Sequence, residues 1–169
     1  MTTPPLNYSH YLKLDELLAL QQPLSDGPEH DETLFIIIHQ VYELWFKQLL
    51  HELEGLKAAF AAGTHVRALA GLRRILTILK TLVSQVDILE TMSPLSFNAF
   101  RARLEASSCF QSAQFRAVEF CLGYKRLEVM ELHPQGSYGR LLLERIYPAP
   151  ALYDCFLSYL AAQGHSIPA

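Results

Sequence analysis

The sequence has few charged residues and no excess of basic ones. Only 18% of its 169 residues are Asp, Glu, Lys or Arg, against about 25% in an average soluble domain. The 14 Lys and Arg residues face 17 Asp and Glu residues, which gives a formal net charge of −3. This balance argues against a protein that binds nucleic acid through basic charge, so no nucleic-acid partner is predicted.

Cysteine is scarce, and the segments that direct a chain to a membrane are missing. Cys109, Cys121 and Cys155 are odd in number and widely spaced, which indicates neither a zinc knuckle nor a disulfide framework. The first residues lack the basic and then apolar pattern of a signal peptide. The purest apolar run, Leu34–Ile38, is far shorter than the roughly 18 residues that a membrane helix needs. We therefore expect a cytoplasmic protein with no membrane association.

Apolar residues, by contrast, are abundant. They make up 50% of the chain, and aromatic residues make up 11%. So apolar and weakly charged a chain suggests that a partner chain or a cofactor covers part of its apolar surface. An efficient core of its own would account for the same composition, and composition alone does not separate the two.

The apolar spacing is helical almost throughout. With Pro4 and Pro5 blocking a helix, residues 1–10 are predicted to form an extended N-terminal arm, followed by a single helical domain over residues 11–169. We found no strand-like alternation and no internal repeat. The predicted fold class is all-α, a helical bundle with two long central helices. The expected helices cover residues 11–21, 31–62, 65–92, 94–104, 111–122, 138–146 and 151–163.

The two long helices carry different apolar patterns. Residues 31–62 are apolar around most of the helix circumference, which predicts burial on several sides and an end at Gly63. In residues 65–92, a 3-4-3-4-3 spacing is typical of a seam between helices. The residues of this predicted seam are Leu69, Leu72, Leu76, Leu79, Val83 and Val86.

Two pairs of residues could carry chemistry. Phe35 and His39 are four residues apart on the most apolar helix and would share one wall, as would Phe97 and Arg101 on a shorter helix. An Arg beside an aromatic ring can hold a carboxylate while the ring covers an apolar substrate. The alternatives are a satisfied core histidine and a surface arginine whose stem packs on aromatic rings. Spacing alone selects no reaction.

Longer segments resemble one known family. Residues 30–47 read HDExLFIIxHQVYELWFK, which is similar to the signature helix of the tryptophan 2,3-dioxygenase family. Further similar segments follow in the family's order: YxxYLxLD at 8–15, LETMSP at 89–94, FxxFR at 97–101, SSxFQSxQFR at 107–116, LYD at 152–154 and GHSIP at 164–168. The resemblance covers nearly the whole chain.

The resemblance implies an all-helical homotetramer that binds heme b and uses O2 to open the indole ring of L-tryptophan, giving N-formyl-L-kynurenine. By position, His39 would be the distal histidine that accepts the indole N–H, and Phe35 would pack on the indole and line the heme pocket. Arg101 would bind the substrate carboxylate, with Phe97 beside it. Tyr8 and Tyr11 would reach into a neighbouring subunit's pocket and close it over the substrate.

The sequence also departs from the family pattern. Cys109 stands where the family has a glycine near heme and substrate, so it could crowd the pocket or touch the heme. Val86 replaces an aromatic residue beside the heme edge. The histidine that binds the iron belongs to a family segment beyond Ala169, so no metal ligand is predicted here. A diverged or truncated relative, with another oxidation or no catalysis, is therefore the alternative.

Overall fold

The computed structural model describes residues 7–27, 29–104 and 111–167, and these residues form helices without a strand. The predicted all-α class is confirmed. The α-helices and the 3₁₀ helices, labelled η, are α1 (Tyr8–Leu12), α2 (Leu14–Leu18), α3 (His30–Ala61), α4 (His65–Leu89), α5 (Pro94–Arg101), η1 (Ala102–Leu104), α6 (Ala113–Leu122), η3 (Leu127–Leu132), α7 (Tyr138–Ile146) and α8 (Leu152–Ala162).

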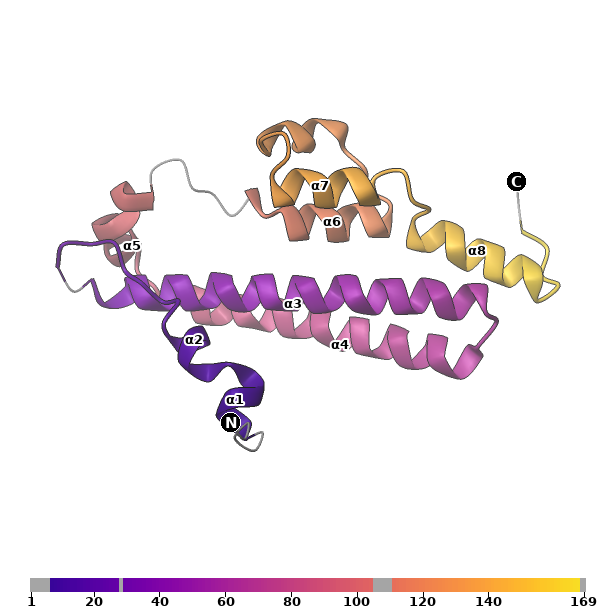
Figure 1. Ribbon diagram of the computed structural model, residues 1–169, viewed down its shortest axis with the longest axis horizontal. Coiled ribbons are helices and arrows are strands. Elements are labelled where there is room, and N and C mark those ends of the chain that lie inside the picture. The colour runs from indigo at the N-terminus through magenta and orange to yellow at the C-terminus, as the bar shows by residue number, and fades with distance from the viewer. Residues whose placement is uncertain (1–6, 28, 105–110, 168–169) are drawn as a thin grey trace, which may run out of the picture.

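The long antiparallel pair α3 and α4 forms the base of the molecule (Figure 1). The other face of α3 is covered along its length by α5, α6 and α8, while α7 and η3 lie over α6. The main core cluster includes Leu49, Leu53 and Leu56 of α3, each only 1% exposed. Burial of each such side chain stabilises the fold by about 1.5–3 kcal/mol. Helix α3 is thus the element against which most others pack.

Most helix boundaries follow the predicted signals. Gly63, in the left-handed region at φ +64°, follows the end of α3, and Gly123 ends α6 at φ +110°. Only a residue without a side chain adopts these angles at low cost. The Ser93 hydroxyl accepts the Ser96 N–H at 3.0 Å and begins α5, with Pro94 in its first turn. The two expected long helices are confirmed.

The predicted seam of α4 is not the face that packs against α3, so this prediction is wrong. The buried residues of α4 are Ala68, Ile75, Ile78 and Leu82. They form an apolar row next to the predicted seam on the helix surface. Leu79 packs partly against the core, whereas Leu69, Leu72, Leu76, Val83 and Val86 are exposed. Polar contacts fix this rotation, because the Tyr42 hydroxyl donates to the Leu82 carbonyl at 2.8 Å and Arg74 pairs with Glu52 at 2.9 Å.

The N-terminal region also differs from its prediction. Residues 8–10 are helical, since the Asn7 side chain accepts the His10 N–H at 2.9 Å and caps α1. The expected single helix over residues 11–21 is broken at Lys13, which takes the left-handed conformation (φ 55°, ψ 46°). Apolar spacing continues through this residue and gave no sign of the break.

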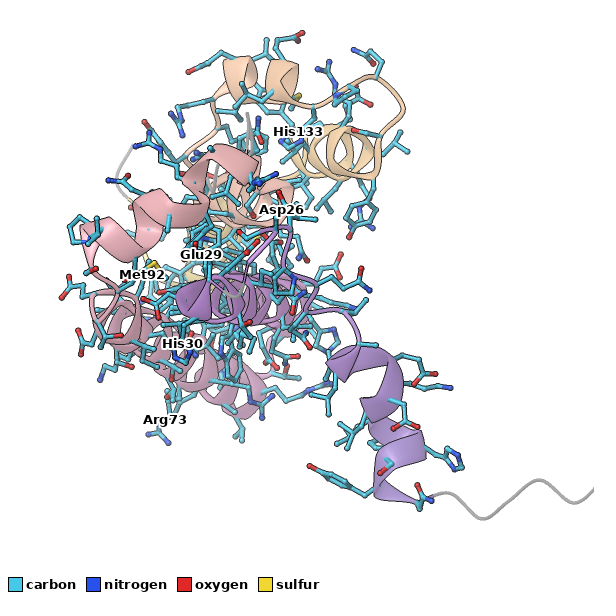
Figure 2. All side chains as sticks on the ribbon, turned by 90° about the vertical axis from the view of Figure 1, so that its left-hand side faces the viewer. Asp26, Glu29, His30, Arg73, Met92 and His133 are labelled. Atoms are coloured by element: carbon cyan, nitrogen blue, oxygen red, sulfur yellow. The ribbon has the colours of Figure 1, made fainter. Side chains whose placement is uncertain are left out.

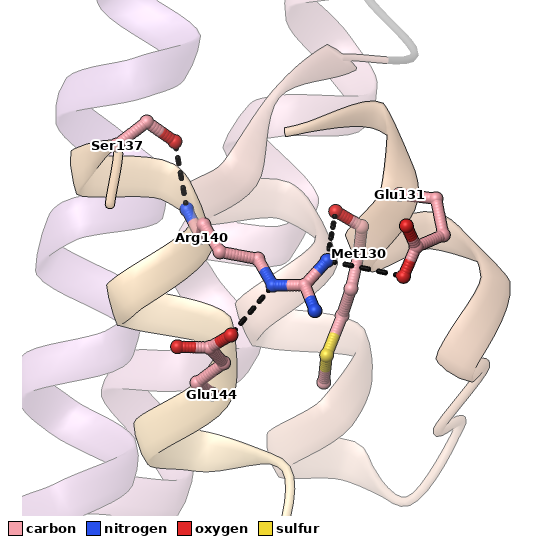
Figure 3. A network of polar contacts seen from close by, with 5 residues as sticks. All are labelled: Met130, Glu131, Ser137, Arg140 and Glu144. Atoms are coloured by element: carbon pink, nitrogen blue, oxygen red, sulfur yellow. Dashed lines mark hydrogen bonds and ion pairs between the residues drawn. The ribbon is translucent and has the colours of Figure 1, made fainter. Parts of the chain in front are cut away.

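A smaller cluster joins α6, α7 and η3, a 3₁₀ helix that the sequence did not predict. Arg140 at the start of α7 holds η3 in place: it donates to the Met130 carbonyl at 2.9 Å and pairs with Glu131 at 3.2 Å and Glu144 at 2.6 Å (Figure 3). Its neighbour Gly139 packs so closely that a Cβ there would lie 2.9 Å from the Ala113 Cβ. None of the described helices is both long and apolar enough to cross a membrane.

Two glycine-to-alanine substitutions should therefore change the free energy of unfolding in opposite directions. Gly139→Ala should lower the free energy of unfolding by about 1–3 kcal/mol, because the Ala113 Cβ cannot move without its backbone. Gly71→Ala in the middle of α4 meets only Leu56 at 3.7 Å and should raise it by about 0.5–1 kcal/mol. Urea unfolding followed by circular dichroism measures both. Equal signs would contradict the packing at Gly139.

Candidate functional site

Helix α3 carries the first wall of the candidate site close to its N-terminus. Glu29, in an extended conformation, precedes the helix, and Asp31 and Glu32 place negative charge on its first turn, where the helix dipole favours it. One turn further on, the rings of Phe35 and His39 lie on the same face with centroids 4.1 Å apart. The structure confirms that these two residues share one wall.

The backbone determines which nitrogen of His39 is protonated. His39 Nδ1 lies 2.7 Å from the Phe35 carbonyl oxygen. A carbonyl oxygen only accepts hydrogen bonds, so Nδ1 carries the proton in this contact. In the neutral ring, Nε2 then has a lone pair and acts as an acceptor. The half-buried His39 is thus prepared to receive an N–H group from a ligand.

Helix α5 brings the second wall against the first. Phe100 is fully buried and its ring centroid lies 5.5 Å from that of Phe35. The Phe97 ring lies 5.8 Å from Phe35 and 5.5 Å from Phe100. Phe35 therefore contacts the rings of His39, Phe97 and Phe100, and joins the two predicted pairs into one site. Sequence reasoning did not assign Phe100 to the site, although its spacing of three residues from Phe97 was visible.

Arg101 ends α5 and supplies the positive charge of the site. Its guanidinium carbon lies 5.8 Å from the Phe97 ring centroid, and the residue is exposed. Within the described ranges, Arg101 makes no ion pair. Its fork of N–H donors is thus available to a carboxylate next to an apolar wall.

The other predicted residues lie elsewhere. Tyr8 and Tyr11 are on α1, 74% and 72% exposed, on an arm that projects from the opposite side of α3 to α6 and α7 (Figure 1). The fold does not bring them to the aromatic wall of their own chain. Cys109 lies outside the described residues. Within the described ranges, no three His, Cys, Asp or Glu side chains gather as a metal site.

The described residues contain two cysteines. Cys121 and Cys155 are unpaired, one buried and one half-buried in the main core. Burial raises the pKa of the Cys121 thiol, which keeps it protonated and chemically inert. Neither cysteine belongs to the candidate site.

Known proteins are similar to this chain over most of its length. The profile of the tryptophan 2,3-dioxygenase family matches residues 2–138. The tryptophan 2,3-dioxygenase of Herpetosiphon aurantiacus is 58% identical over 163 residues, which cover 96% of this chain and 62% of that protein. The enzyme of Anaeromyxobacter sp. strain K is 53% identical over 96% of this chain and 61% of its own length.

A third relative, the tryptophan 2,3-dioxygenase of Kineococcus radiotolerans, is 45% identical over 99% of this chain and 58% of its own length. The chain thus spans about three fifths of the length of these curated relatives. Identity at this level over nearly all of the chain, together with the match to the family profile, means that the chain belongs to the tryptophan 2,3-dioxygenase family.

Proposed function

We propose that this chain forms the distal pocket of a heme-dependent dioxygenase, which uses O2 to open the indole ring of L-tryptophan and gives N-formyl-L-kynurenine. One observation carries the proposal: the Phe35 carbonyl accepts the Nδ1–H of His39, which in the neutral ring leaves Nε2 as an acceptor on an aromatic wall. Indole is a flat apolar ring with one N–H donor. The wall and the acceptor match both of these properties.

Each residue of the site would perform a distinct task. Arg101 would bind the substrate carboxylate through two parallel hydrogen bonds, and Phe97 would cover the adjoining apolar part. Phe35 would pack on the indole ring. His39 would accept the indole N–H and orient the ring, without acting as an obligatory base. Together these contacts would exclude water and strengthen the Arg101–carboxylate interaction.

The wall of Phe35 and His39 supports a heme on this side of the site. Phe35 and His39 offer an apolar ring and a polar group on the same wall, and the resemblance places Val86, in place of an aromatic residue, beside the heme edge. Heme b, when bound, would supply the redox chemistry with O2. The resemblance assigns the iron's own ligand to a family segment beyond Ala169, and Cys109 to the substrate side of the heme.

We also propose a cytoplasmic protein and a homo-oligomer, which is a tetramer by the resemblance. The exposed tyrosines support the oligomer. Tyr8 and Tyr11 lie on α1, and neither α1 nor α2 contains a buried residue. Exposed aromatic side chains on a projecting segment are typical of a contact with another chain. We propose that they close the pocket of a second copy over its substrate.

Heme loading is the direct test of this function. Hemin titrated into the purified chain should give a sharp Soret band that shifts with CO after reduction. With tryptophan and O2, the loaded protein should then release N-formylkynurenine. A heme spectrum without this product would favour a diverged oxidation, and no specific spectrum would indicate a scaffold that needs the remaining part of the family fold.

Removal of the acceptor should slow turnover and preserve the heme spectrum. His39→Ala should lower kcat about 10- to 100-fold, because the variant loses a neutral hydrogen bond to the indole N–H and with it the orientation of the indole ring. The substrate analogue 1-methyltryptophan has no indole N–H to donate. With this analogue, the kcat of the wild-type protein should exceed that of His39→Ala much less than with tryptophan. An equal ratio of kcat values for the two substrates would contradict the assigned contact.

Loss of the guanidinium should act on substrate binding. Arg101→Ala should raise the KM for tryptophan about 10- to 100-fold, because a charge-assisted hydrogen-bonded pair contributes roughly 1.5–3 kcal/mol. Arg73 is exposed on the far helix α4, so Arg73→Ala is the matched control and should leave KM unchanged. Steady-state kinetics and equilibrium tryptophan binding measure both variants. Unchanged affinity in Arg101→Ala would refute the carboxylate role.

A further inference from the structure

The loop between α2 and α3 is fastened to α3 by a buried carboxylate. Glu32, in the first turn of α3, is only 2% exposed. Its Oε1 accepts the Leu24 N–H at 2.7 Å and its Oε2 accepts the Ser25 N–H at 3.2 Å. These donors precede Glu32 by eight and seven residues. Both oxygens thus hold the incoming loop, and neither caps α3 itself.

The surroundings of Glu32 keep it charged. Burial alone would raise the pKa of the carboxyl, but hydrogen bonds from Ser25 and Leu24 and the positive charge of Arg103 outweigh burial and lower it. The positive end of the α3 dipole acts in the same direction. An ionised carboxylate that accepts two backbone N–H groups forms stronger hydrogen bonds than a neutral amide would.

Three further contacts fasten the same loop. Asp26 forms an ion pair with Arg103 in η1, and the Gln21 side chain donates to Gln40 Oε1 at 2.5 Å. Gln40 in turn donates to the Leu20 carbonyl at 3.2 Å. The loop is therefore held by α3 and by η1, which directly follows α5. We call the contacts of Glu32 with Leu24 and Ser25, together with the Asp26–Arg103 pair, the arm latch.

The described part of the arm beyond this loop is exposed at nearly every residue. Neither α1 nor α2 contains a buried residue, and Lys13 between them is in the left-handed conformation. Figure 2 looks onto the end of the bundle that carries Asp26, Glu29 and His30, and shows the arm leaving it to one side. A small rotation at the loop would move Tyr8 and Tyr11 by a much larger distance.

We propose that Glu32 is a positioning residue, which through the arm latch sets the direction of the arm so that Tyr8 and Tyr11 reach the pocket of a second copy. The inference rests on the proposed function, in which these tyrosines close that pocket. Glu32 touches no substrate in this arrangement. It links the first turn of α3, one turn before Phe35, to the base of the arm. In this proposal a second copy binds that arm.

Glu32→Gln tests the latch, because it removes the charge and one of the two acceptors at nearly constant volume. Asp31→Asn is the matched control, since it removes one negative charge from the same helix turn. Asp26→Asn is a milder second variant: its side chain is 83% exposed, so folding should be unaffected. Helical circular dichroism and urea unfolding verify that each variant is folded.

Two readouts separate positioning from folding. The first is release of the peptide 1–13 by trypsin, which cuts after the exposed Lys13, followed by mass spectrometry at low and high protein concentration. Wild-type protein should protect Lys13 only at high concentration, and Glu32→Gln should be cut about tenfold faster there. The second is steady-state kinetics of the heme-loaded protein, where KM for tryptophan should rise about 5- to 10-fold with kcat within about twofold. Asp26→Asn should change the rate of cutting at Lys13 and the KM in the same direction as Glu32→Gln. Asp31→Asn should change neither.

Each outcome decides the proposal. Equal cutting at Lys13 in wild type, Glu32→Gln and Asp31→Asn would overturn it, as would protection that does not depend on protein concentration, since the arm would then dock on its own chain. Absence of turnover in every variant would refute the proposed function, while the trypsin result would still decide the latch. Normal turnover with unchanged KM in Glu32→Gln would refute the latch alone.

Discussion

The contact between Phe35 of α3 and the fully buried Phe100 of α5 is the interaction on which the site depends. Helix α5 is only eight residues long and would be marginal on its own. Packing of Phe100 against Phe35 docks this helix on α3. That docking brings Phe97 and Arg101 to the wall that already holds His39. The site is therefore a product of tertiary packing between two segments about sixty residues apart in the sequence.

Helix positions could be predicted well from the sequence, because their signals are local. Ser93 and Pro94 begin a helix and Gly123 ends one whatever surrounds them. The burial of α4 could not be predicted in the same way. Two adjacent rows on this helix are apolar, and both satisfy helical spacing. The choice between them depends on nonlocal partners, such as the Tyr42 hydroxyl on the Leu82 carbonyl.

The same distinction applies to the site. Spacing placed Phe35 with His39 and Phe97 with Arg101, since residues four apart share a helix face. It could not show that both pairs meet, because that requires the fold of α5 onto α3. Nor could it indicate the protonated nitrogen of His39, which is set by a backbone carbonyl. The resemblance to a family named the residues, and the geometry supplies a physical reason for the role of His39.

Much apolar surface remains exposed on both sides of α3. Val83 on α4 is 72% exposed, and Leu18 on α2 is 72% exposed. Apolar surface of this extent in a chain with only 18% charged residues is unfavourable in water unless another surface covers it. The chain matches about three fifths of the length of these relatives. The arm requires a different explanation, because a buried ion and an ion pair hold its base while its described helices, α1 and α2, contain no buried residue. Such an arrangement favours contact with another molecule over packing within the chain, since the polar contacts at the base orient a segment that has no core of its own.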